Sequence, residues 1–178
     1  MASPEKDRAY LETGISELEA YLLSDELYWP ITARGYDLPR LTIGGLLLAQ
    51  ARLEARWERI GALVAQLNAV RSKWRVAWET KAGRGYQARM RLWGNFLADY
   101  RHNPEGHADL YPQEVRNRVM LHLLLGEISP LPPGQQELSQ LDSVLRANLI
   151  TGKFIWAADV RPGFPREVYW YLYGKLKS

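Results

Sequence analysis

The 178-residue sequence contains no cysteine. A chain without thiols cannot form a disulfide, bind a metal ion through thiolate sulfur or use a cysteine nucleophile. Long apolar runs are also missing, since the best run, residues 43–49, is far shorter than the roughly 18–20 residues of a membrane span. The first dozen residues hold five charged side chains and no apolar signal-peptide core. We therefore expect no membrane span and a cytoplasmic location.

Sequence motifs for catalysis and cofactor binding are missing as well. The glycine pairs at 44–45 and 83–85 match neither a dinucleotide-binding nor a phosphate-binding loop, and no G-x-S-x-G is present. Only three histidines occur, His102, His107 and His122, and the first two flank a Gly/Pro turn. We predict no catalytic, cofactor or metal site and keep a metal-dependent helical-bundle enzyme as a distant alternative.

The composition is that of a globular protein. Apolar residues make up 47% of the chain and charged residues 24%, which argues against disorder. The length suits one domain, residues 1–178, with a sizeable core. Seven Trp and ten Tyr residues are present, and such rings bury large areas when a partner satisfies the N–H or O–H.

A heptad pattern of apolar residues is the clearest structural signal. Seven residues are close to two turns of an α-helix, so side chains at this interval form one stripe along a helix. We predict a single long helix over residues 43–80, capped by Thr42, as the centre of the fold. The stripe consists of Leu46, Leu53, Ile60, Leu67 and Trp74, with a second track through Leu63, Val70 and Ala77.

The remaining elements are predicted to complete an irregular all-α bundle of about six helices around that central helix. A first helix should cover residues 4–23 and be capped by Ser3, and an aromatic strap with Pro and Gly should follow over 24–41. Gly83 and Gly85 should break or kink the chain, although one long bent helix is the alternative. Further helices are expected over 86–102, 112–126, 135–149 and 165–176, with a short extended piece at 153–156.

The basic stretch from residue 71 to 101 is the strongest signal that is not structural. It holds eight basic and two acidic residues, whereas residues 1–40 hold four basic and eight acidic ones. Phosphates attract such cations and unpaired bases stack on the interleaved rings, but acidic residues 17, 19, 25 and 26 of the same chain are the competing partners. The candidate contacts to nucleic acid or another anion are Arg71, Lys73, Arg75, Lys81, Arg84, Arg89 and Arg91.

The end of the chain is unusually aromatic. If residues 165–176 form a helix, aromatic side chains surround it on all sides. One face would then pack on the bundle and leave Trp170 and Tyr171 for a partner, a second copy or the segment 154–156. We predict these two rings as protein-contact residues.

These observations favour a non-enzymatic interaction or assembly protein that acts through a protein partner or through self-association. The alternative is a sequence-nonspecific nucleic-acid-binding protein that uses the basic stretch. The residues match no protein family that we recognise.

Overall fold

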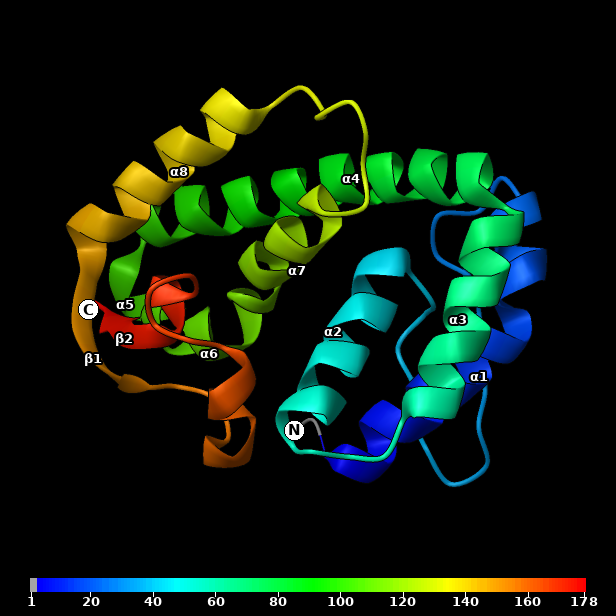
Figure 1. The fold of residues 1–178 in the computed structure, drawn as a ribbon. Helices are drawn as coiled ribbons and strands as arrows, with labels where there is room; N and C mark the ends of the chain where they lie inside the picture. Colours follow the sequence, from blue (N-terminus) through cyan, green and yellow to red (C-terminus); the bar gives the residue numbers. More distant parts are fainter. Residues whose placement is uncertain (1–2) are drawn as a thin grey trace.

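The computed structural model describes residues 3–178, and this part of the chain is mainly helical. Figure 1 shows the long helix α4 crossing the whole molecule, with α1, α2 and α3 near its amino-terminal half and α5, α6 and α8 near its carboxyl-terminal half. The helix bounds are α1 Pro4–Leu23, α2 Ile43–Ala55, α3 Gly61–Lys73, α4 Arg75–His102, α5 Pro104–His107, α6 Tyr111–Glu114, α7 Arg116–Leu125 and α8 Gln135–Asn148.

Short 3₁₀ turns and one small sheet complete the described residues. Strands β1 and β2 pair antiparallel, with Leu149 opposite Leu176 and Phe154 opposite Tyr173. The remaining bounds are η1 Ala108–Leu110, β1 Leu149–Phe154, η2 Ala158–Gly163, η3 Trp170–Leu172 and β2 Tyr173–Leu176. In residues 3–178, no helix has the length and apolar character needed to cross a membrane.

Both predicted helix caps are confirmed. The Lys6 N–H donates to Ser3 Oγ over 3.2 Å, and the Gly45 N–H donates to Thr42 Oγ1 over 3.0 Å. Each hydroxyl thus satisfies an N–H that has no partner within its own helix. The first helix spans the residues that the sequence predicted, and α8 matches its predicted range to within one residue.

The prediction of one helix over residues 43–80 is wrong, because α2 ends at Ala55. The chain turns there through Trp57, whose φ is +59°. The Glu58 N–H donates to Leu53 O over 3.0 Å and the Trp57 N–H donates to Glu54 O over 3.0 Å, which is the hydrogen-bond pattern of a Schellman motif. Glycine usually takes this left-handed position, so the tryptophan gave the sequence analysis no stop signal.

The heptad residues are nevertheless buried. Leu46, Leu53, Ile60 and Leu67 are each at most 4% exposed, and Trp74 is half-buried. They lie on α2, on α3 and at the starts of α3 and α4, rather than along one helix. The pattern therefore predicted correctly that these side chains are buried, and incorrectly that they lie on one continuous helix.

The predicted break at Gly83 and Gly85 is wrong too, because α4 runs through both glycines. The expected separate helix over 86–102 is the second half of α4. Its buried face contributes Trp78, Tyr86 and Trp93, each at most 1% exposed. Burial of three such large side chains on one helix outweighs the cost of the glycines, which is about 1 kcal/mol each.

The carboxyl-terminal prediction also fails, since residues 165–176 form a turn, η3 and β2 instead of a helix. Within the aromatic run, Tyr171 and Leu172 of η3 are fully buried and Tyr173 begins β2. Gly174 lies against β1 so closely that an added Cβ would overlap Ile150 O.

The predicted helix over 112–126 begins at Tyr111 and is interrupted at Val115, where α6 meets α7. The extended piece expected at 153–156 belongs to a longer strand that ends at Phe154.

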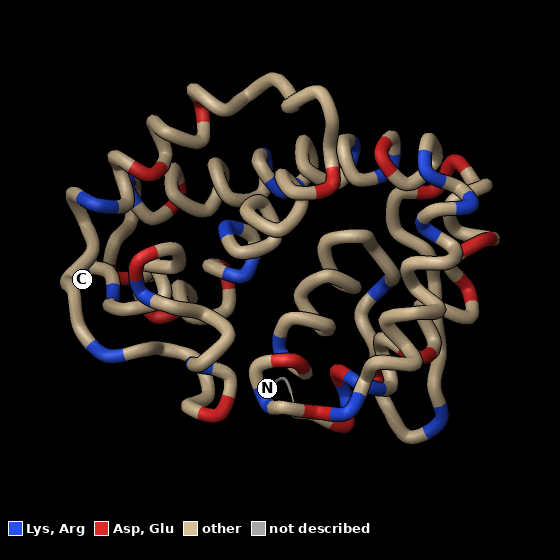
Figure 2. Tube along the Cα trace, viewed as in Figure 1, with Lys and Arg blue, Asp and Glu red and all other residues tan. Residues whose placement is uncertain are grey.

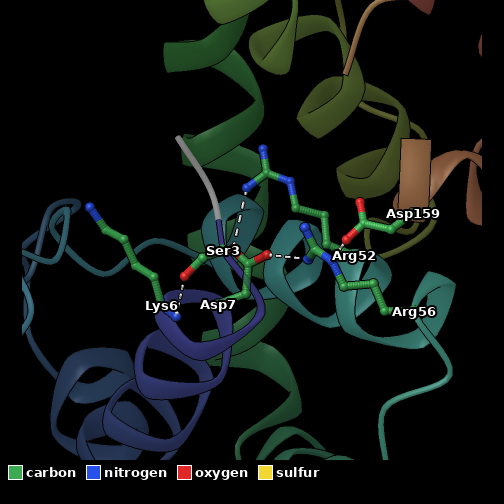
Figure 3. A network of polar contacts seen from close by, with 6 residues as sticks. All are labelled: Ser3, Lys6, Asp7, Arg52, Arg56 and Asp159. Carbon is green, nitrogen blue, oxygen red and sulfur yellow. Dashed lines mark hydrogen bonds and ion pairs between the residues drawn. The ribbon is translucent and has the colours of Figure 1, made fainter. Parts of the chain in front are cut away.

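A cluster of two acids and two arginines joins the ends of the chain (Figure 3). Asp7 on α1 accepts from Arg56 Nη1 over 2.9 Å and from Arg52 Nη1 over 3.4 Å. Asp159 in η2 accepts from Arg56 Nε over 2.8 Å. The Asp7 and Arg56 side chains are 8% and 6% exposed, and burial raises the pKa of Asp7 while the two guanidinium groups counteract that shift. The cluster links α1, the end of α2 and the carboxyl-terminal segment.

Replacing Trp57 by glycine tests the strained helix end. Trp57 is 85% exposed, so its removal loses little packing, while glycine adopts the left-handed conformation without a steric penalty. We expect Trp57→Gly to raise the free energy of unfolding by about 1 kcal/mol in urea titrations. Trp57→Ala, which keeps a Cβ, should show no such gain, and an equal gain would rule out backbone strain as the cause.

Asp7→Asn tests the buried acid. The change removes the charge that Arg52 and Arg56 share, leaving buried guanidinium groups undercompensated, so we expect a loss of about 3 kcal/mol of unfolding free energy. The matched control is Glu58→Gln, because Glu58 pairs with Arg8 at the surface and should contribute less than about 1 kcal/mol. Equal effects of the two variants in chemical denaturation would contradict the assigned role of burial.

Candidate functional site

Most of the predicted basic residues bind acceptors of the same chain. Arg71 pairs with Glu127 over 3.1 Å, Lys73 with Glu19 over 3.3 Å, and Arg75 with Glu79 over 3.0 Å. Figure 2 shows basic and acidic positions interleaved where α3, α1 and the start of α4 lie together. Of these three pairs, only Lys73–Glu19 joins the basic stretch to an acid of the amino-terminal part, so the competing interpretation of the sequence holds for this one cation.

Lys81 and Arg84 bind the end of the first helix and the start of the strap. The Lys81 ammonium donates to Ser24 O and Glu26 O, both over 2.7 Å, and is buried. Arg84 stays exposed and donates to Asp25 O over 3.0 Å. These two cations satisfy carbonyl groups of residues 24–26 and so hold this short segment on α4.

Arg89 lies in a different place, between α4, α7 and the start of α2. Its guanidinium donates to Asn117 Oδ1 over 3.0 Å and to Thr42 Oγ1 over 3.4 Å. Burial lowers the pKa of Arg89. The seven predicted cations therefore do not form one exposed patch, and Arg91 is exposed on the groove described below.

The two predicted contact aromatics differ in their surroundings. Tyr171 is fully buried, because residues 170–172 form a 3₁₀ turn packed on the core rather than a surface helix. Arg118 lies over its ring at 4.5 Å and pairs with Asp142 over 2.7 Å. Trp170 is half-buried beneath the Arg146 guanidinium, 3.7 Å from the ring centre. Tyr171 therefore offers no surface to a partner.

The histidines do not form a metal centre in the described part of the chain. No group of three or more His, Asp or Glu side chains in residues 3–178 is placed to hold a metal ion. His107 Nδ1 lies 2.9 Å from Asn103 O, and the His122 ring packs edge-on against Tyr169 at 5.0 Å. Partial burial, assisted by the Arg118 charge, lowers the pKa of His122.

An open groove lies between the amino-terminal half of α4 and the proline-rich loop before α8. Its volume is about 750 Å³, within the range of ligand sites in proteins. Val76 on one wall is 78% exposed and Leu131 on the other is 62% exposed. The lining residues are Leu27, Val76, Glu79, Thr80, Gly83, Arg84, Gln87, Arg91 and Ile128 to Pro133.

The proline-rich loop is fixed on one side of this groove. Gln87 Nε2 on α4 donates to Pro133 O over 3.1 Å, and Pro132 is buried. Proline restricts the backbone, so this wall loses little conformational freedom when a ligand binds.

Gly83 faces this groove from the amino-terminal half of α4. A Cβ added to Gly83 would meet no atom within 4 Å, so packing within the described chain does not require glycine at this position. The missing side chain opens the groove wall and lets a ligand approach the helix backbone closely.

Sequence reasoning missed this groove. Its parts were visible in the sequence as the proline-rich loop 129–134, the glycines of residues 83–85 and the apolar residue Val76. The glycines were read as a helix break, and nothing in the sequence placed the loop beside α4. No protein-family model, curated protein or solved structure matches this chain.

Gly83→Ala tests whether the fold needs this glycine. Alanine favours a helix interior and its Cβ enters open space, so the free energy of unfolding should rise by about 0.5–1 kcal/mol. Gly14→Ala is the contrasting variant, because its Cβ would lie 2.6 Å from Leu46 Cδ2 and should lower stability. A loss of stability in Gly83→Ala, measured by thermal unfolding, would show that the groove wall is tightly packed.

Proposed function

We propose that this protein is a non-enzymatic interaction module that binds a segment of a partner protein in the α4 groove. The observation that carries the proposal is the pair of highly exposed apolar side chains, Val76 and Leu131, on opposite walls of one groove. Exposed apolar side chains that line a common hollow are typical of interaction sites, whereas single scattered ones are ordinary.

The way the elements pack on α4 also supports this proposal. The proposal treats residues 3–178 as one domain, an irregular helical bundle around α4. The sequence predicted a different central helix, over residues 43–80. Helices α1, α2, α3, α7 and α8 each contact α4. A wall that belongs to such a well-supported helix is rigid, and rigid sites bind with a smaller loss of conformational entropy.

The alternative of nucleic-acid binding has less support. Phosphate binding needs several free cations on one surface. Six of the seven predicted cations hydrogen-bond or ion-pair within the chain, and Lys81 is buried. Arg84 and Arg91 remain exposed on the groove, where they flank an apolar surface rather than form a basic track.

Selection from a displayed library of random peptides tests the proposal. We expect peptides that bind the wild-type protein with micromolar affinity and lose at least about tenfold in affinity, or 1.4 kcal/mol, on Gly83→Trp and on Val76→Glu. Tryptophan at position 83 fills the groove, and glutamate at position 76 requires a buried charge in the complex.

Two matched variants serve as controls. Gly61→Trp places the same ring at a helical glycine whose Cβ also meets open space, and Leu92→Glu places a charge at an exposed apolar position of α4 outside the groove. Both should bind the selected peptides like the wild type. The proposal would be overturned if the selected peptides bound all four variants equally. It would also be overturned if short oligonucleotides bound at low salt and no selected peptide depended on the groove.

A further inference from the structure

One continuous seam of side chains runs along α4 and is only partly covered. Its positions follow each other at alternating intervals of four and three residues, the spacing that keeps a seam facing a partner helix. The seam consists of Val76, Thr80, Gly83, Gln87, Met90 and Gly94.

Helix α8 covers the carboxyl-terminal part of this seam. A Cβ added to Gly94 would lie 3.8 Å from Leu141 Cδ1, and one added to Gly134, the residue before α8, would lie 3.8 Å from Met90 Cε. Leu138 and Leu145 on the same side of α8 are buried. In Figure 1, α8 runs beside the second half of α4 and the proline-rich loop enters near the helix middle. The molecule thus already places an amphipathic helix on this seam.

Within residues 3–178, α8 does not extend over the amino-terminal part of the seam, which lines the groove instead. Val76, Thr80, Gly83 and Gln87 all line the groove, and Val76 and Thr80 are exposed. Gly83 lies at the centre of this part, and a small residue at the centre of a helix crossing allows the second helix to approach closely.

We propose that the groove accepts an amphipathic α-helix of a partner protein, in line with α8 on the same seam and with acidic residues facing Arg84 and Arg91. This inference rests on the proposed function and specifies the partner. The partner helix presents apolar side chains at intervals of three and four residues, as helices bound in grooves commonly do.

The charges of the groove favour an acidic partner. Arg84 and Arg91 are exposed, seven residues apart on one edge of α4, hence about 10 Å apart along the axis. Arg84 donates to Asp25 O through Nη1, and its guanidinium has further N–H groups for a carboxylate. Among the described residues that line the groove, the one carboxylate belongs to Glu79 and already pairs with Arg75. Two acids seven residues apart on the partner helix therefore match the two guanidinium groups, in the manner of edge charges in coiled coils.

Other modes of peptide binding fit the groove less well. An extended peptide gains affinity by pairing with free N–H and C=O groups of a sheet edge. Here the walls are a helix, whose groups pair internally, and a loop in which Pro130, Pro132 and Pro133 have no N–H to donate. Polyproline segments bind on aromatic surfaces, and none of the described residues that line the groove is aromatic.

The test uses a displayed library of amphipathic helices, each about three heptads long, with varied seam residues and varied edge charges. Some peptides should bind the wild type and Gly61→Trp but not Gly83→Trp. We expect these peptides to carry acidic residues along one edge of the helix. A proline at the centre of such a peptide should weaken binding at least about tenfold, because it breaks the helix. The double change Arg84→Glu with Arg91→Glu should also weaken binding about tenfold and should favour lysine-bearing versions of the same peptides.

The outcomes separate this inference from the function on which it rests. Groove-dependent peptides that tolerate the central proline, or that bind equally with acidic and basic edges, would overturn the inference and leave peptide binding in place. If the library yields no peptide whose binding depends on the groove, the proposed function itself is overturned. A concentration-dependent dimer that light scattering detects and that Gly83→Trp abolishes would identify a second copy as the occupant and would also overturn the inference.

Discussion

The structure depends on the burial of the aromatic face of α4. Trp78, Tyr86 and Trp93 lie on that face at most 1% exposed, and Phe96 stacks on Trp93 with ring centres 5.6 Å apart. Each large ring that is removed from water contributes roughly 1.5–3 kcal/mol. Elements from both halves of the chain pack on this helix, so α4 sets their relative positions (Figure 1).

Polar contacts then specify how the parts are joined. Asp7, Arg56 and Asp159 link the first helix, the end of the second and the carboxyl-terminal segment, although these residues are far apart in the sequence. Such a buried pair adds little net stability because desolvation opposes the ionic attraction. Its effect is mainly directional, since a misplaced Arg56 would leave a buried charge without its partner. The same arginine follows α2 directly, where the helix ends on a strained tryptophan.

The groove lies where the first half of α4 and the proline-rich loop run beside each other, ahead of the part of α4 that α8 covers. One side of the helix is buried in the core, while the seam that α8 covers further along is left open here. The proline-rich loop reaches the helix middle and is held there by Gln87. The open seam, the exposed Val76 and the exposed Arg84 and Arg91 therefore lie together, and that combination supports the proposed binding of an acidic amphipathic helix.

Several features could be predicted from local sequence because their causes are local. Ser3 and Thr42 cap helices through their own hydroxyl groups, and the leucines of residues 138–145 repeat at the helical period. Other predictions failed because the residue type gave no local signal or because a distant contact decided the outcome. Trp57 takes a conformation typical of glycine, Gly83 and Gly85 remain helical because aromatic burial holds α4 together, and Gly174 serves the approach of β1 rather than a helix. The groove could not be predicted, since its two walls, residues 76–91 and residues 128–133, are far apart in the sequence.

The sequence by itself determined the mainly helical class, the caps, the burial of Leu46, Leu53, Ile60 and Leu67, and the exclusion of thiol chemistry. The reason is that helical period, capping and residue chemistry act over a few neighbouring residues. Only the tertiary structure decided where the long helix begins, which cations are neutralised, and that Tyr171 is buried while Val76 is exposed. These outcomes depend on which segments, far apart in the sequence, pack against the same surface. The order of the residues alone does not show which segments meet.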